Sequence, residues 1–302
     1  MSQLTINKNY SKSFFVAKVL HKLEFPSKIS RIYNKHRHQV IKSKLELVLN
    51  YSKNLAYKNI EEKKKKENSN IIWIFWWQGE NKMPAIVKKC YKSILRNRGK
   101  RRVILVTKDN VKNISTIPNY IYIKIEKKEI TLTHFSDILR FNLLDNYGGL
   151  WVDATIYVTQ SLDRVDTHSL FTCSGYSKEN YFNISYGRWT GFFIGGPAQL
   201  KIFHFMNVFF EVYWKYNNKL IDYFLIDYAL DYAWKYNMSN FQRISKEYQN
   251  YAPDMFKLQI ILNEKYNDLS WNDLNISTSL FKLSYKKNIN YSDKQNFFNY
   301  LK

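Results

Sequence analysis

Three charged residues in one apolar stretch are the strongest chemical signal in this sequence. Asp137 and Arg140 lie three residues apart, and Asp153 follows in a segment otherwise dominated by Leu, Phe, Trp and Val. A buried charge is costly unless it is paired or binds a ligand. Arginine binds oxyanions and hydroxyl groups bidentately, so this set of residue types suits a polar ligand. We therefore expect the three residues to serve a binding site in a cleft.

The predicted elements around these residues could bring them together. The Ser136 hydroxyl is suited to cap a helix, because it can accept a hydrogen bond from a free helical N–H. Gly148 tolerates positive φ where that helix would end. Residues 150–158 then predict an apolar, internal strand. Ligands bind at the carboxyl ends of strands in open α/β sheets, and Asp153 is expected near such an end.

Alternating strand and helix patterns predict an α/β fold with a mainly parallel, Rossmann-type sheet flanked by helices. Residues 71–77 predict a buried first strand, and Pro84 suits the first turn of the helix that follows. The remaining expectations are strands at 103–107 and 121–125, glycine-rich loops with short strands at 171–194, and helices at 199–216 and 219–236.

The first 66 residues carry over half of the excess positive charge. They contain 16 Lys and Arg against four Glu, and the whole chain has a net charge of +22. Apolar residues at helical spacing predict two basic helices separated at Pro26, and a lysine-rich linker at 61–70 predicts a boundary between segments 1–66 and 67–302. Basic amphipathic helices can lie on an anionic membrane. They can also pack on the main domain with a solvated basic face.

Composition excludes several other classes. The 302 residues, 45% of them hydrophobic, suffice for one large domain with an appendage. Cys90 and Cys173 allow one disulfide, and no Cys/His spacing typical of a metal site occurs. No signal peptide is recognised, and the strongest apolar run is too short to span a bilayer. A cytoplasmic protein, soluble or peripheral on the inner membrane face, is expected.

Five segments resemble the capsular polysaccharide synthesis family of glycosyltransferases, which is similar to other DXD sugar transferases such as glycosyltransferase family 32. The segments are His134-Phe-Ser-Asp-Ile-Leu-Arg140, Tyr147-Gly-Gly-Leu-Trp-Val-Asp-Ala-Thr155, Ile72-Trp-Ile-Phe-Trp-Trp-Gln-Gly79, Thr190-Gly-Phe-Phe-Ile-Gly-Gly196 and Leu220-Ile-Asp-Tyr-Phe-Leu-Ile-Asp227. The resemblance covers roughly residues 70–285. It implies a GT-A-like fold, a nucleotide-sugar donor, expected to be a UDP-sugar, and a growing, lipid-linked surface glycan as acceptor.

The resemblance also implies residue roles. Asp137 and Arg140 would hold the donor sugar, and Asp153 would contact the ribose and the metal-bound diphosphate as the first acid of the DXD motif. One of Asp222 and Asp227 would be the acceptor's base or a donor contact. The nucleotide would lie against residues after the first strand, with a glycine allowing close approach; these residues are Trp76, Trp77, Gln78, Gly79 and Gly195.

Thr155 is a departure from the DXD pattern. It stands where the second acid is usually the direct metal ligand, and a neutral hydroxyl is a weak ligand for Mn²⁺ or Mg²⁺. Dependence on a divalent cation, with Asp153 as its protein ligand, is therefore left open. Basic residues could instead neutralise the leaving diphosphate.

Several structural and functional alternatives also remain open. Asp137 and Arg140 could be a structural ion pair, Trp76 or Trp77 could be core residues, and Asp222 or Asp227 could be surface or packing acids. Thr155 leaves room for a non-catalytic sugar-binding or scaffold protein. The charge and the 24 Tyr, 20 Phe and 8 Trp would also suit single-stranded nucleic acid. Nucleic acid is not the expected partner, because the charge is concentrated near the N-terminus and no nucleic-acid-binding module is recognised.

Overall fold

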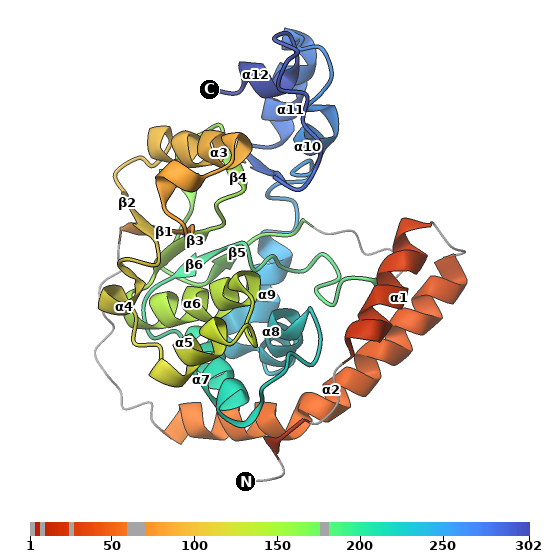
Figure 1. Ribbon diagram of the computed structural model, residues 1–302, viewed down its shortest axis with the longest axis vertical. Coiled ribbons are helices and arrows are strands. Elements are labelled where there is room, and N and C mark those ends of the chain that lie inside the picture. The colour runs from red at the N-terminus through yellow and green to blue at the C-terminus, as the bar shows by residue number, and fades with distance from the viewer. Residues whose placement is uncertain (1–3, 7–9, 24–26, 59–69, 176–180) are drawn as a thin grey trace.

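A five-stranded mixed sheet of order β2-β1-β3-β6-β5 organises the chain, and helices cover it as Figure 1 shows. The computed structural model describes residues 4–6, 10–23, 27–58, 70–175 and 181–302. In this sheet the strands are β1 (Ile71–Phe75), β2 (Arg102–Val106), β3 (Gly149–Val152), β5 (Phe171–Thr172) and β6 (Phe193–Gly196). A second, two-stranded sheet pairs β4 (Ile156–Val158) with β7 (Leu280–Lys282).

The α-helices account for most of the remaining described chain. They are α1 (Ser11–Lys22), α2 (Ser27–Lys58), α3 (Ala85–Arg96), α4 (Val111–Ile114), α5 (Asn119–Glu126), α6 (Leu132–Tyr147), α7 (Lys201–Tyr216), α8 (Leu225–Lys235), α9 (Phe241–Glu247), α10 (Lys257–Ile261), α11 (Asp268–Ser277) and α12 (Phe297–Tyr300). The predicted α/β fold, GT-A-like with helical N-terminal residues, is confirmed.

Strand alternation divides the interior into two hydrophobic layers. Successive side chains of a strand point to opposite faces. Ile72 and Ile74 of β1 pack with α3 on one face, whereas Trp73 and Phe75 join the layer formed with α6 and α7. Each face of the sheet is therefore covered, which explains why the predicted first strand is an almost continuous apolar run.

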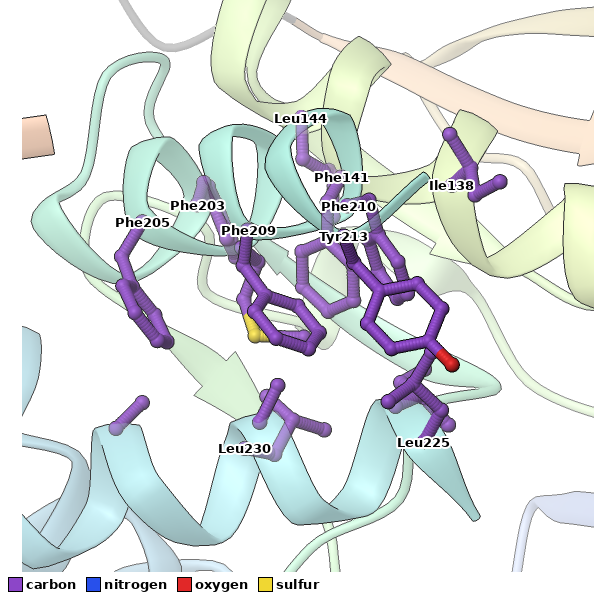
Figure 2. Packing of buried hydrophobic residues seen from close by; sticks show 14 of the residues in the cluster. Ile138, Phe141, Leu144, Phe203, Phe205, Phe209, Phe210, Tyr213, Leu225 and Leu230 are labelled. Carbon is purple, nitrogen blue, oxygen red and sulfur yellow. The ribbon is translucent and has the colours of Figure 1, made fainter. Parts of the chain in front are cut away.

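Helix α6, which carries Asp137 and Arg140, rests on a layer of aromatic side chains. Figure 2 shows Phe141 of α6 packed beside Phe210 of α7, with Leu225 and Leu230 of α8 beneath α7. All four of these side chains are completely buried. Burial of each such side chain contributes roughly 1.5–3 kcal/mol, so this layer holds α6 firmly against the sheet.

The two predicted N-terminal helices are present as α1 and α2. Helix α2 packs along α7 and α8 with Ile41, Leu45 and Val48 buried, and Figure 1 shows it passing beneath the main body. The predicted break at Pro26 and nearly all of the predicted linker at 61–70 lie outside the described residues. The division at residue 66 stays a prediction.

The strand predicted at 121–125 is wrong, because these residues form α5. Pro118 precedes the helix at the N-cap position, and Ile121 and Tyr122 are buried. Tyr120 Oη also donates a hydrogen bond of 2.7 Å to Glu211 O of α7. A short apolar run cannot be assigned from periodicity alone, and here packing against α7 favours a helix.

The single strand predicted at 150–158 is also wrong. It is broken into β3 and β4, which belong to different sheets, with residues 153–155 between them. The expectation of a mainly parallel sheet needs a related correction. Strand β1 is parallel to β2 and β3, whereas β6 runs antiparallel to β3 and β5.

Three smaller outcomes concern helix ends, cysteines and membrane spans. Thr131, rather than Ser136, caps α6 by accepting from His134 N, and the helix predicted from residue 219 begins only at Leu225. Gly148 ends α6 with φ 66°, as expected. Cys90 and Cys173 are free and buried. Over the described helices, none has both the length and the apolar character needed to cross a membrane.

Candidate active site

A cavity of about 980 Å³ lies at the carboxyl ends of β1 and β3. Trp76 and Trp77 enter its lining directly after β1, and Asp153 enters directly after β3. Asp137 and Arg140 reach it from α6. The volume is within the range of small-molecule sites, which commonly form at this edge of α/β sheets.

Backbone hydrogen bonds hold Asp153 at the point where β3 ends. Asp153 N donates to Phe192 O at 2.9 Å, beside the last residue pair of the β3–β6 ladder. Ile156 N then donates to Asp153 O at 2.9 Å and closes a tight turn. The turn redirects the chain into β4, and it leaves both Asp153 and Thr155 in the cavity lining.

Arg140 joins the two predicted acids. Its Nη1 donates to Asp137 Oδ1 at 2.8 Å, and its Nη2 donates to Asp153 Oδ1 at 3.2 Å. The same Asp153 oxygen accepts from Trp151 Nε1 at 2.9 Å, and the guanidinium lies 5.0 Å from the centroid of the Trp151 ring. The structure thus brings together the three charged residues singled out in the sequence and fixes Arg140 from several sides.

Lys282 is a cavity residue that the sequence reasoning missed. Its Nζ donates to Asp153 Oδ2 and to Thr155 Oγ1, both at 2.8 Å. The register of the second sheet pairs Lys282 with Ile156, directly after Thr155. A lysine between Phe281 and Leu283 is a charge in an apolar strand, the same kind of signal that identified Asp153. Its partner, however, is 129 residues away in sequence.

The two cations determine the charge state of Asp153. Burial acts to raise its pKa, but the charges of Lys282 and Arg140, with hydrogen bonds from Lys282 and Trp151, outweigh burial and hold the pKa below its ordinary value. Asp153 is therefore an ionised carboxylate whose two oxygens face cationic donors.

Asp227 has a different environment. It lines the same cavity from the first turn of α8, and its Oδ1 accepts from Trp189 Nε1 at 3.0 Å. Burial, reinforced by the negative charge of Asp137, raises the pKa of Asp227 to about 7. A carboxylate with a pKa near neutrality can take up or release a proton during turnover.

The predicted nucleotide-binding residues divide into two groups. Trp76, Trp77 and Gln78 line the cavity, as does Thr155. Gly79 is outside the described lining; it turns the chain away from β1 with φ 79°. Gly195 is likewise outside the described lining, since it lies in β6 where a Cβ atom would approach Gly149 O to 2.6 Å. Close pairing of β3 with β6 accounts for Gly195 without a ligand.

Asp222 lies outside the described cavity lining. Its Oδ2 pairs with Arg37 Nη2 of α2, and its Oδ1 accepts from Phe224 N at 2.9 Å. The Asp222 side chain is completely buried. The structure therefore separates the two predicted acids: Asp227 reaches the cavity, and Asp222 joins α2 to the segment before α8.

Three cavity residues have a buried polar atom without a hydrogen-bond partner among the described parts of the chain. These atoms are Trp76 Nε1, Arg140 Nε and Ser185 Oγ. Buried polar groups are nearly always hydrogen-bonded, so a buried donor without one in a cavity wall points to a ligand with acceptor oxygens or nitrogens.

The sequence profile of the family described as capsular polysaccharide synthesis protein matches residues 22–301. The chain belongs to this family. The match begins at the end of α1 and continues through α2, both sheets and the C-terminal helices, so the cavity of this capsular polysaccharide synthesis protein lies wholly inside it. No curated protein matches the chain.

Proposed function

We propose that this capsular polysaccharide synthesis protein is a glycosyltransferase that uses a nucleotide-sugar donor. One observation supports the proposal above all: Arg140 bridges Asp137 and Asp153 at the carboxyl end of β3, in the wall of a large cavity. A saccharide offers hydroxyl groups to the acids, and a diphosphate offers oxyanions to the arginine. A UDP-sugar is the donor we expect, and a growing surface glycan, carried on a lipid, is the acceptor.

The residues divide the reaction between them. Trp76 and Trp77 bind the nucleotide base, and Asp137 with Arg140 orients the donor sugar. The acceptor oxygen bonds to the anomeric carbon, the bond from that carbon to the diphosphate oxygen breaks, and Asp227 takes the acceptor proton. Positioning and charge stabilisation of the departing diphosphate supply most of the rate enhancement.

A panel of nucleotide sugars tests this function. The full chain is incubated with each donor, with and without glycan acceptors, and released nucleoside diphosphate is measured. We expect release with one donor, faster with a suitable acceptor. A donor that binds in a thermal-shift assay but is never consumed, under any cation condition, would instead favour a non-catalytic sugar-binding protein.

We also propose that the hairpin of α1 and α2 binds an anionic membrane surface. Exposed apolar side chains lie on both helices and directly after α1; they are Phe15, Val16, Leu23, Ile29 and Ile32. Exposed cationic side chains accompany them, namely Lys12, Lys18, Lys22, Lys28, Arg31 and Lys35. Figure 1 shows this hairpin projecting to one side of the sheet. Apolar insertion combined with cationic attraction is the combination that holds peripheral helices on a bilayer.

A further inference from the structure

Lys282 contacts Asp153 and Thr155, the two residues at the positions where a DXD protein would bind its cation. Its ammonium contacts Asp153 Oδ2 and Thr155 Oγ1 at the same distance of 2.8 Å. The side chain is only 20% exposed, and Nζ lies 4.6 Å from the centroid of the Phe192 ring. This is a built position rather than a surface contact.

The backbone keeps Lys282 in this position. Lys282 N donates to Met255 O at 2.8 Å, and Leu283 N donates to Thr155 O at 2.9 Å. Strand β7 is therefore attached directly to the segment that carries Asp153 and Thr155. Pairing of β7 with β4 therefore keeps the Lys282 side chain close to Asp153 and Thr155.

A divalent cation does not fit these donors. Asp153 Oδ1 already accepts from Arg140 and Trp151, Oδ2 accepts from Lys282, and Thr155 offers only a neutral hydroxyl that Lys282 also occupies. Mg²⁺ at about 2.0–2.1 Å from Oδ2 would lie within about 5 Å of the ammonium and be repelled by it. Across the described residues, no group of three or more His, Cys, Asp or Glu could hold a metal ion.

We propose that the Lys282 ammonium takes the place of a divalent cation, so that the donor diphosphate is bound and neutralised without a metal. This inference rests on the proposed glycosyltransferase function and deepens it. An ammonium has three N–H donors. Two of them contact Asp153 and Thr155, and the third is directed to a diphosphate oxygen.

The charge of the cavity wall fits this role. Five cationic side chains line it against three aspartates; the cations are Lys82, Arg140, Lys282, Lys286 and Lys287, and the acids are Asp137, Asp153 and Asp227. Together they favour a dianionic or trianionic ligand over an additional cation. Lys286 and Lys287 follow Lys282 closely in the chain, so one C-terminal segment supplies three of the five charges.

Binding of inorganic pyrophosphate tests the role of Lys282 without needing the donor sugar or any turnover. Calorimetry on the full chain in EDTA should show binding, and saturating Mn²⁺ should change the affinity less than about twofold. Lys282→Ala should weaken binding in EDTA by about tenfold to hundredfold, as expected for loss of a charged hydrogen bond. Mn²⁺ should then restore part of the affinity of Lys282→Ala, because Asp153 Oδ2 is freed.

Two further variants control for indirect effects. Lys282→Arg keeps the charge and should retain cation-independent binding. Lys257→Ala is the matched control: Lys257 also pairs with an aspartate, Asp254, at 2.9 Å, but it lies outside the described cavity lining. It should bind pyrophosphate like the wild type. Should a Lys282 variant fail to fold, the comparison of wild type in EDTA and in Mn²⁺ remains decisive.

The inference is overturned if wild-type protein binds pyrophosphate only with Mn²⁺, or if Lys282→Ala binds as tightly as wild type in EDTA. These results differ from failure of the proposed function. A protein that releases nucleoside diphosphate only with Mn²⁺ would still be a glycosyltransferase, but Lys282 would not replace its metal.

Discussion

Two aspartate–arginine pairs in this protein consist of the same residue types but differ in their burial and in the charges around them. In one, Asp153 pairs with Arg140 at 3.2 Å, and the acid is 24% exposed in a cavity wall. In the other, Asp222 pairs with Arg37, and the acid is completely buried between α2 and the start of α8. The pairing of residue types is the same, yet only one pair can meet a ligand.

The number of cations around each acid separates the two pairs further. Burial acts to raise the pKa of both aspartates. For Asp153, two neighbouring cations outweigh burial and the pKa falls; for Asp222, Arg37 alone does not, and the pKa rises. A second cation costs less free energy beside a water-accessible acid than in a sealed core. Five cationic side chains against three aspartates line the cavity that Asp153 faces, and this surplus of positive charge suits an anionic ligand.

Loss of one partner of the buried pair gives the largest expected effect. Asp222→Ala leaves Arg37 charged and unpaired inside the protein, so we expect the free energy of unfolding to fall by about 3–5 kcal/mol. Urea unfolding monitored by circular dichroism measures this change. The double variant Arg37→Met/Asp222→Leu should recover most of the stability, because it removes both charges. If Asp222→Ala instead abolished activity in a protein of unchanged stability, Asp222 would be a site residue after all.

Substitution in the cavity pair should reduce activity strongly and stability only slightly. Asp153→Asn keeps the shape of the side chain but removes the charge that orients Arg140 and Lys282. We expect transfer and donor hydrolysis to fall by about 10²–10³-fold, comparable with loss of other electrostatic contacts in active sites. In urea unfolding, the free energy of unfolding should fall by less than it does for Asp222→Ala, because Asp137 still pairs with Arg140 and Asp153 is partly exposed. Near wild-type transfer by this variant would contradict the proposed site.

The contrast between the two pairs also explains what the sequence could predict. Strong apolar periodicity identified β1, β2, α3 and α7, and charges in an apolar segment identified Asp137, Arg140 and Asp153. The sequence placed Asp222 and Asp227 five residues apart in one segment and did not decide which of them reaches the site. Only the packing of α2, whose Arg37 is 185 residues from Asp222 in the chain, separates them.

Local patterns failed wherever a distant partner decided the structure. Residues 121–125 form a helix that packs against α7, and residues 156–158 pair with β7 in a second sheet. Lys282 was missed for the same reason, because its importance lies in contacts with Asp153 and Thr155. Helix ends were the other weak point: Thr131 caps α6 five residues before Ser136. Local propensity does not determine such long-range contacts.

The proposed membrane-binding surface allows a second comparison, between two cationic residues of α2. Arg37 is buried with Asp222, whereas Lys28, nine residues earlier, is exposed beside Ile29. Charge reversal of Lys18, Lys22 and Lys28 to Glu should therefore leave stability and the cavity unaffected. Binding to vesicles containing anionic lipid should weaken by about 1 kcal/mol or more for each lysine, measured by co-sedimentation.

A second triple variant with the same net charge tests whether membrane binding depends on α1 and α2. Lys108, Lys127 and Lys294 are exposed outside α1 and α2, and their reversal to Glu changes the net charge equally. This second triple variant should still bind the vesicles. Equal loss of binding by both variants would show that net charge, rather than the hairpin, attracts the membrane.

The smallest expected effect is the pH dependence due to Asp227. Its hydrogen-bonding partner is the neutral Trp189 rather than a cation. Asp227 therefore tests whether neighbouring cations set the pKa values of the aspartates. Its pKa is raised from 3.8 to about 7. If ionised Asp227 takes the acceptor proton, kcat/KM should rise about tenfold between pH 6 and 8 with a midpoint near 7.

Protein stability should follow the opposite slope. The unfolded chain releases the Asp227 proton near its ordinary pKa, but the folded chain keeps it to about pH 7. The stabilisation is therefore fully present below about pH 4 and is lost as the pH rises through about 7. Asp227→Asn resembles the protonated side chain, so it should match wild-type stability below about pH 4 and exceed it increasingly up to pH 8. If the free energy of unfolding had the same pH dependence in wild type and Asp227→Asn, the raised pKa would not belong to Asp227. The contrast between the pKa values of Asp153 and Asp227 would then be wrong.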